Sequence, residues 1–304
     1  MSKYSLAIAG LIFTTFIWGV TFELVKNSLN EATPFIFSSI RFFIAFSLTF
    51  LLVSIKSKQI KITKDEFIAG IICAIFLFLG YSFQTTGLWE GLEGFGSNDF
   101  FGPSDPNKSA FITGTSVLMV PVIMLFIGQT NKSIHLWISI LIVLIGLVIL
   151  LDPNVEKFTI GDMLTFGCSL SFAIHIIFQG KYVTQGFNIY NFFLVQTGIV
   201  TVLFLIMAIF EYQFMGGFIN SNIIVLKGLL ITGVLATFIA ILIMVWAQKI
   251  VSPIQTAMIF TLEPVFAGLY NHFFTNYPLT DWGKFSGLII VLGIMYHEYK
   301  VNKA

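Results

Sequence analysis

Residues Ser252 to Asn271 read Ser-Pro-Ile-Gln-Thr-Ala-Met-Ile-Phe-Thr-Leu-Glu-Pro-Val-Phe-Ala-Gly-Leu-Tyr-Asn, an apolar stretch long enough to cross a membrane. Glu263 and Pro264 lie near its middle. A charge at the centre of a membrane helix costs about 2.5 to 3.5 kcal/mol on the insertion scale for Asp, Lys and Arg. A proline there removes a backbone hydrogen bond and loosens the helix. The pair therefore predicts a polar cavity within the membrane, with the rest of the chain forming its wall.

The composition of the 304-residue chain is that of an integral membrane protein. Hydrophobic residues make up 57% of it, charged residues only 10%, and the mean hydropathy is +0.91, whereas soluble domains carry about 25% charged residues. Its lysines form no basic patch beyond one short loop, so we expect no nucleic-acid partner. Cys73 and Cys168 lie in apolar segments, where small packing residues are common. The sequence contains no phosphate-binding loop, metal-ligand pair or cysteine cluster, so we expect no cofactor and no metal.

Apolar segments of membrane-spanning length recur along the whole chain. We identify ten, at roughly residues 5–25, 34–54, 67–88, 109–128, 135–151, 161–181, 189–210, 223–246, 252–273 and 282–299. The first is too long for the apolar core of a cleavable signal peptide and is interpreted as a membrane anchor. The predicted fold class is therefore an all-α integral membrane protein with ten transmembrane helices.

The lysines predict the orientation of these helices. With the N-terminus inside, ten lysines fall on the inner side and five on the outer side. The inner set is Lys3, Lys56, Lys58, Lys61, Lys64, Lys132, Lys181, Lys249, Lys300 and Lys303, and the outer set is Lys26, Lys108, Lys157, Lys227 and Lys284. Because cytoplasmic loops carry the excess of positive charge, we expect a multi-pass protein of the cell (cytoplasmic or inner) membrane with both termini in the cytoplasm.

The two halves of the chain resemble each other weakly. Placing Pro121 on Pro264 aligns Ser109-Ala-Phe-Ile-Thr with Ser252-Pro-Ile-Gln-Thr. The predicted repeats span residues 5–151 and 161–299, and an odd count of five helices in each forces opposite orientations in the membrane. The first repeat has an outer insertion at about residues 89–108, rich in glycine and acidic residues. It is either a lid or partner-binding loop, or a surface insertion without function.

Several stretches in order resemble the EamA-type transporters of the drug/metabolite transporter superfamily. They are Trp18-Gly-Val-Thr-Phe22, Lys26, Pro34, Ser39-Ile-Arg41-Phe-Phe-Ile-Ala45, Phe83-Gln-Thr-Thr-Gly-Leu88, Ser109-Ala-Phe-Ile-Thr-Gly114, Ala247-Gln-Lys-Ile-Val-Ser-Pro253 and Leu262-Glu-Pro-Val-Phe-Ala267. The resemblance covers nearly the whole chain apart from the insertion. It implies a ten-helix, two-repeat carrier of small metabolites with a central cavity.

Glu263 is the first candidate for substrate binding or proton coupling, because an intramembrane carboxylate is costly unless it is used. Its alternative role is a structural hydrogen bond beside Pro264. Arg41 is the only arginine in the chain. It either binds an anionic group, pairs with Glu263 or Glu23, or extends to the outer membrane interface.

The remaining candidates are polar or aromatic side chains on the predicted helices, and each could equally be a packing residue. They are Trp18, Tyr81, Gln84, Thr113, His175 and Trp246. His175 is either a proton carrier or a neutral ring bonded to a neighbour. Gly283-Lys-Phe-Ser-Gly287 permits close helix packing or a homodimer contact.

We predict a secondary transporter, an exporter or permease, that moves a small polar or amphipathic metabolite by alternating access, with proton exchange as the coupling reaction. The alternatives are a membrane scaffold or sensor with an outer partner-binding loop, and a lipid-modifying membrane enzyme. Such an enzyme would need carboxylates clustered at one membrane face, and here they are isolated. We therefore expect no enzymatic activity, and partners limited to the metabolite, membrane lipids and a second copy.

Overall fold

The computed structural model describes residues 2–56, 60–96, 99–129, 133–151, 158–274 and 280–301, and all regular elements in these residues are helical. The first half contains α1 (Lys3–Leu29), α2 (Pro34–Lys56), α3 (Lys64–Leu88), the short η1 (Glu90–Phe95) and η2 (Asp99–Phe101), α4 (Pro106–Gly114), α5 (Ser116–Phe126) and α6 (Ile134–Leu151). The second half contains α7 (Ile160–Val183), α8 (Ile189–Phe214), α9 (Ile223–Leu230), the π-helical η3 (Ile231–Ile239), α10 (Ala240–Ala247), α11 (Pro253–Phe260), α12 (Glu263–Phe274) and α13 (Asp281–Val301).

The helix bounds follow local capping chemistry. Thr63 with Glu66, Thr159 with Asp162, and Ser252 with Gln255 form reciprocal capping boxes at the starts of α3, α7 and α11. In each box the side chains satisfy backbone N–H groups that the first helical turn leaves unpaired. Every predicted segment matches a helix, or helices in sequence, within a few residues.

Seven helical stretches in the described residues are long and apolar enough to cross a membrane: Lys3–Leu29, Pro34–Lys56, Lys64–Leu88, Pro106–Phe126, Ile160–Val183, Ile189–Phe214 and Ile223–Ala247. These confirm an all-helical membrane protein. The other three predicted spans correspond to α6, to α11 with α12, and to α13. They stay predictions, because α6 is shorter and the others do not meet the same criteria of length and hydropathy.

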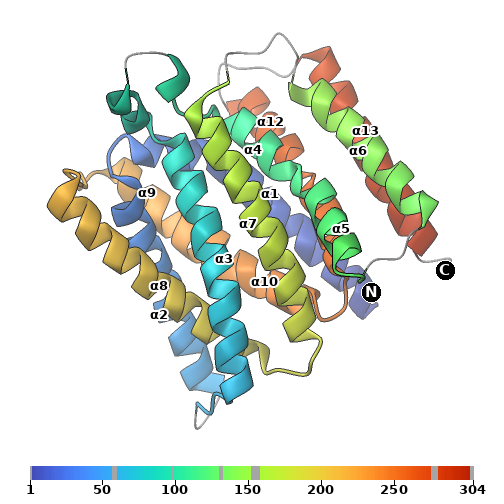
Figure 1. Cartoon of the computed structure of the whole chain (residues 1–304), viewed down its shortest axis with the longest axis horizontal. Coiled ribbons are helices and arrows are strands. Elements are labelled where there is room, and N and C mark those ends of the chain that lie inside the picture. Colours follow the sequence, from blue (N-terminus) through green and yellow to red (C-terminus); the bar gives the residue numbers. More distant parts are fainter. Residues whose placement is uncertain are drawn as a thin grey trace.

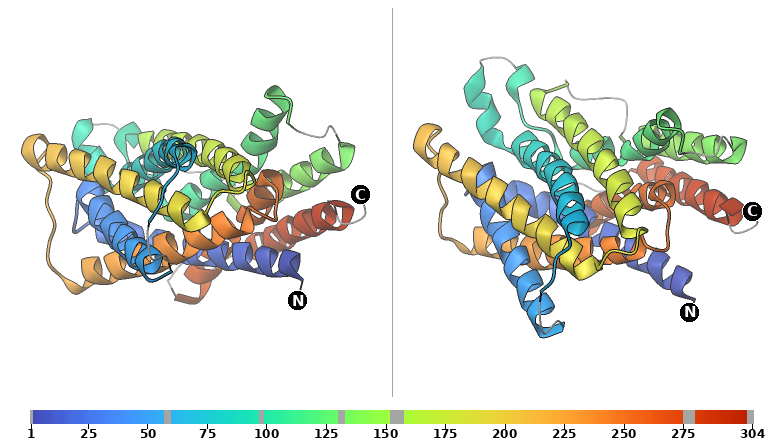
Figure 2. Two further views of the ribbon diagram at one scale, coloured as in Figure 1. Left: turned by 90° about the horizontal axis from the view of Figure 1, so that it is seen from below. Right: turned by 60° about the horizontal axis from the view of Figure 1, so that its bottom comes forward.

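The two halves are interleaved in one bundle (Figures 1 and 2). α2 packs on α8, α3 on α7, and α1 on α10 and α12, so the major contacts join the first half to the second. α6 and α13 pair at one edge of the bundle (Figure 1). Both termini lie at one end, here called the terminal end; the other carries η1 and η2 and is called the insertion end (Figure 1).

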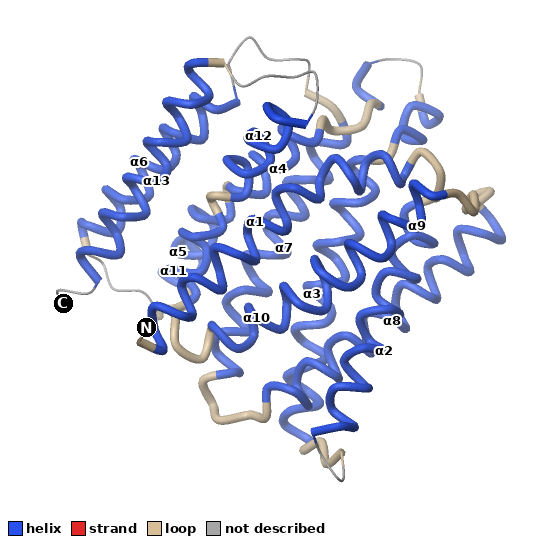
Figure 3. The backbone as a smooth tube through the Cα atoms, turned by 180° about the vertical axis from the view of Figure 1, so that it is seen from behind, coloured by secondary structure: helices blue, strands red, loops and turns tan. Residues whose placement is uncertain are grey.

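The stretch that contains Glu263 and Pro264 is two helices and not one. α11 ends at Phe260 and α12 begins at Glu263, with a turn at Thr261 and Leu262 (Figure 3). Proline is tolerated in the first turn of a helix, so Pro264 does not distort α12. A similar one-residue break at Thr115 separates α4 from α5. Two of the helical stretches are therefore discontinuous near their middle.

Small residues let helices approach closely within this bundle. Gly283 and Gly287 are both buried, and a Cβ atom on Gly287 would lie 3.3 Å from Val265. Gly287 therefore permits close packing of α13 against α12 inside the chain, and the homodimer contact stays a prediction. Cys73 and Cys168 are free and buried, as the interpretation of them as packing residues expects.

Candidate functional site

A central cavity lies where α1, α2, α3, α4, α7 and α10 meet the start of α12. Within it, a volume of about 50 Å³ is open to the centre of a water-sized sphere. Seven of the eight candidate residues line it: Trp18, Arg41, Tyr81, Gln84, Thr113, His175 and Glu263. Trp246 does not line it; its ring packs against the core beside Gly10. Polar side chains dispersed over 245 positions of the sequence thus converge on one cavity.

Glu263 is the first residue of α12, and its side chain is buried with only 6% of the residue exposed. It has no hydrogen-bond or ion-pair partner among the described residues, so the structural hydrogen bond considered above is absent. The free N–H groups and dipole of a helix N-terminus favour a negative charge at this position. The break before α12 therefore presents a carboxylate to the cavity at an electrostatically favourable place.

Gly19 of α1 allows this arrangement. A Cβ atom there would lie 2.7 Å from the carbonyl oxygen of Glu263 and 2.8 Å from the Cβ of Phe266. Only a residue without a side chain lets the α1 backbone come so near the start of α12. Trp18, the neighbour of Gly19, is thereby placed against the same cavity.

Arg41 is buried in α2 and forms no ion pair with Glu263 or Glu23 in the described residues, so this structure does not show that alternative. Its Nε donates to the hydroxyl of Thr237, at 2.7 Å, and its guanidinium lies 4.4 Å from the centre of the Tyr81 ring. A cation over an aromatic face is stabilised by the ring quadrupole. The cavity therefore holds one cation and one carboxylate that do not neutralise each other directly.

Aromatic rings form much of the remaining wall. Trp18 meets Phe260 edge-on with centroids 4.9 Å apart, and Tyr81 meets Phe172 edge-on at 5.2 Å. The Trp18 indole N–H donates to the carbonyl of Ala236, at 2.8 Å. Fixed rings of this kind provide apolar surface of defined shape beside the two charges.

His175 begins a buried hydrogen-bonded chain that leads from the cavity toward the terminal end. Gln196 Nε2 is hydrogen-bonded to His175 Nε2 and, at 3.5 Å, donates to Gln179. Gln179 donates to Gln248 at 2.7 Å, and Gln248 donates to the carbonyl of Ile176 at 3.0 Å. Which of the two nitrogens donates in the Gln196–His175 bond depends on the tautomer of the His175 ring. This agrees with the interpretation of His175 as a ring bonded to a neighbour.

Sequence reasoning missed several residues of the site. Thr237 holds Arg41 and Phe172, Phe260 and Ser116 line the cavity. With 35 phenylalanines in the chain, no single one could be selected. Thr237 lies in an apolar helix 196 positions from Arg41 and had no signal in the sequence.

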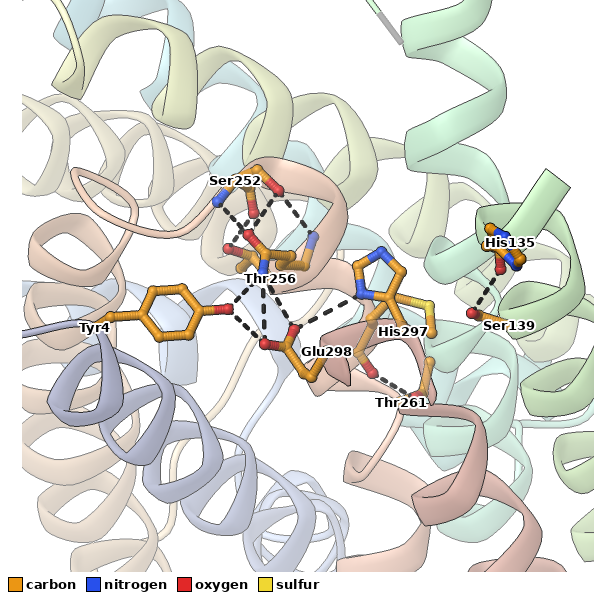
Figure 4. A network of polar contacts seen from close by, with 10 residues as sticks. Tyr4, His135, Ser139, Ser252, Thr256, Thr261, His297 and Glu298 are labelled. Carbon is orange, nitrogen blue, oxygen red and sulfur yellow. Dashed lines mark hydrogen bonds and ion pairs between the residues drawn. The ribbon is translucent and has the colours of Figure 1, made fainter. Parts of the chain in front are cut away.

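Polar contacts join the helices at both ends of the bundle. At the terminal end, Gln255 of α11 donates to Tyr4 of α1 at 2.6 Å and to Glu298 of α13 at 3.2 Å. Tyr4 also donates to Glu298 (Figure 4). At the insertion end, Lys108 forms a 2.6 Å ion pair with Asp162 at the start of α7. Ser104 of the insertion also donates to Asp162, at 2.8 Å. The second part of the insertion is therefore attached to α7; its residues 97 and 98 lie outside the described residues.

The profile of the EamA-like transporter family matches residues 5–91 and 159–297, more than half of the chain. The chain belongs to this family. A protein named uncharacterized transporter from Archaeoglobus fulgidus is 30% identical over 302 residues, covering 96% of this chain and 85% of its own. The uncharacterized transporter YoaV of Bacillus subtilis is 21% identical and covers 97% of both chains.

A solved crystal structure shares the fold, with a TM-score of 0.74 over 98% of both chains at 14% identity. This EamA-like protein is therefore a multi-pass membrane transporter and not an enzyme. The family profile falls on both halves and leaves residues 92–158 unmatched, a range that includes most of the insertion.

Proposed function

We propose that this transporter is a secondary carrier that moves a small polar or amphipathic metabolite by alternating access and binds it in the central cavity. The observation that carries the proposal is the cavity itself, which combines Glu263 from the second half, Arg41 from the first, and fixed aromatic walls. Binding sites of secondary transporters lie at the interface of their repeats and use discontinuous helices. The breaks at Thr115 and at Thr261 support this assignment.

We further propose ten spans arranged as two inverted repeats, residues 5–151 and 161–299, with both termini in the cytoplasm. The helix contacts support the repeats, because exchanging the halves keeps the pattern. The α2–α8 and α6–α13 contacts map onto themselves, α1–α10 maps onto α7–α3, and α4–α12 maps onto α11–α5. The lysine distribution supports the orientation, although Lys58, Lys132, Lys157 and Lys303 lie outside the described residues.

Alternating access needs contacts that can close each end of the cavity in turn. The pair Lys108–Asp162 joins α4 to α7 at the insertion end, and Gln255–Tyr4 joins α11 to α1 at the terminal end. These two contacts occupy equivalent places in the proposed repeats. We propose that they break alternately during transport, and that proton exchange at Glu263 drives export.

The test is transport by the Glu263→Gln variant in proteoliposomes. A thermal-shift screen of the wild-type protein against a metabolite library first supplies the substrate, and a pH gradient then drives its flux. We expect Glu263→Gln to abolish gradient-driven flux while its expression and elution in gel filtration stay normal, because the amide cannot exchange a proton. Glu93→Gln, the same change on the exposed insertion, is the matched control and should transport normally. Normal gradient-driven flux by Glu263→Gln would refute the coupling role.

A further inference from the structure

The eighth predicted span changes from α-helix to π-helix beside the cavity. The π-helical segment η3 covers nine residues, Ile231–Ile239. π-Helical turns are rare, are mostly short, and occur frequently at functional sites. Two cavity residues bond directly to η3: Trp18 donates to the carbonyl of Ala236, and Arg41 donates to the hydroxyl of Thr237.

The Thr237 side chain is oriented by the π-helical register. Its hydroxyl donates to the carbonyl of Thr232, five residues back, at 2.8 Å. In α-helical register a threonine hydroxyl bonds four residues back, as Thr15 does to Leu11 and Thr49 does to Ala45, both at 2.7 Å. Because its proton is directed along η3, the oxygen of Thr237 has a lone pair for the Nε–H of Arg41.

The backbones of η3 and α2 also touch beside this hydrogen bond. A Cβ atom on Gly233 would lie 3.1 Å from the Ile44 side chain and 3.2 Å from the carbonyl oxygen of Arg41. Thr237 is fully buried. The distance between the two helices at Arg41 is therefore set by backbone contact, and the threonine cannot move aside without separating them.

One edge of the guanidinium is thus occupied, its plane is fixed, and the Tyr81 side chain is a further hydrogen-bond partner. Nε bonds Thr237, the Tyr81 ring lies 4.4 Å from the guanidinium carbon, and no carboxylate of the described residues pairs with it. Arginine has five N–H donors in a planar fork, and the fork formed by the Nη groups suits a carboxylate or phosphate. The Arg41 side chain lines the cavity.

We propose that Thr237 is a positioning residue, which through the π-helical turn of η3 aims the Nη groups of Arg41 at an anionic group of the transported molecule. The proposal rests on the proposed function, because it assumes that the central cavity is the substrate site. It adds that the substrate is bound through an acidic group and that η3 determines how well that group is held.

Arg41 is the only arginine in the chain, so its orientation can be measured without a ligand. Protein isotopically labelled at arginine alone gives a single Nε–H signal in the NMR spectrum. We expect this signal to move upfield and to exchange faster with water in Thr237→Val, which keeps the shape but loses the hydroxyl. Thr237→Ser should restore it. Thr14→Val is the matched control, because the buried Thr14 hydroxyl bonds the carbonyl of Ala240 and not Arg41.

Two probes with the same apolar chain, isocaproate and isoamylamine, then test the role of Arg41. Isocaproate should shift the arginine signals of the wild-type protein and bind about tenfold more weakly to Thr237→Val, as expected for losing one hydrogen bond to a charged group. Isoamylamine, which has no carboxylate, should bind both proteins equally.

A Thr237→Val signal that coincides with the wild-type signal overturns the proposal. The proposal is also overturned if Thr237→Val weakens the binding of isocaproate and isoamylamine equally, because that would indicate a merely structural role. It is overturned as well if isocaproate does not shift the arginine signal of the wild-type protein. Failure of the proposed function is a separate result: the wild-type protein would then move no substrate in vesicles, whatever the arginine signal does.

Discussion

Replacing Gly19 by alanine should separate α1 from the start of α12. The added methyl group would lie 2.7 Å from the Glu263 carbonyl oxygen, against an ordinary contact of at least 3.4 Å, so the helices must part by about 0.7 Å. Overpacking of this kind costs about 1 to 3 kcal/mol. A gain in helix propensity of at most about 1 kcal/mol offsets part of it. We expect a net loss of stability and a displaced Glu263.

Gly114→Ala is the matched control, because it makes the same chemical change in a membrane helix next to Pro264. Its Cβ would lie 3.5 Å from both Leu147 and Pro264, which is an ordinary contact. The assay is unfolding in mixed micelles of increasing SDS content, followed by circular dichroism. Gly19→Ala should unfold at a lower SDS fraction than Gly114→Ala, by about 1 to 3 kcal/mol. Equal unfolding of the two variants would refute the argument from close approach.

Two further predictions concern buried groups away from the cavity. Glu211 of α8 accepts hydrogen bonds from the hydroxyl of Thr33 at 2.8 Å and from the backbone N–H groups of Phe35 at 3.1 Å and Ile36 at 3.0 Å, so it caps the start of α2. Glu211→Gln should lower stability in the same micelle assay by about 1 to 2 kcal/mol, since the charge at the helix N-terminus is lost; stability equal to wild type would contradict the capping role. Cys73 and Cys168 are fully buried, so neither should react with maleimide until the protein is unfolded in SDS. Mass spectrometry of the intact protein counts the adducts, and labelling of the native protein would show that the packing around them is wrong.

The positions of the helices could be predicted from the sequence because each has a local cause. An apolar run must pair its own backbone in a membrane, so its length defines a helix, and capping residues such as Thr63 and Thr159 define its start. Polar residues on such helices must turn inward, which is why Arg41, Gln84 and Glu263 meet at one cavity. Trp246 does not line this cavity, and the sequence could not show this because a tryptophan fits a protein core as well as a cavity wall.

The sequence by itself determined the class of protein, the course of its helices and the set of polar residues that must lie inside. The tertiary structure alone decided how those residues are used. α11 ends at Phe260, so Glu263 begins a new helix. Arg41 bonds Thr237 and not a carboxylate, where the helix beside α2 changes from α-helical to π-helical geometry. The physical reason is that hydrophobicity and capping act over a few neighbouring residues. The pitch of a helix and the partner of a buried charge depend on packing between segments almost two hundred residues apart.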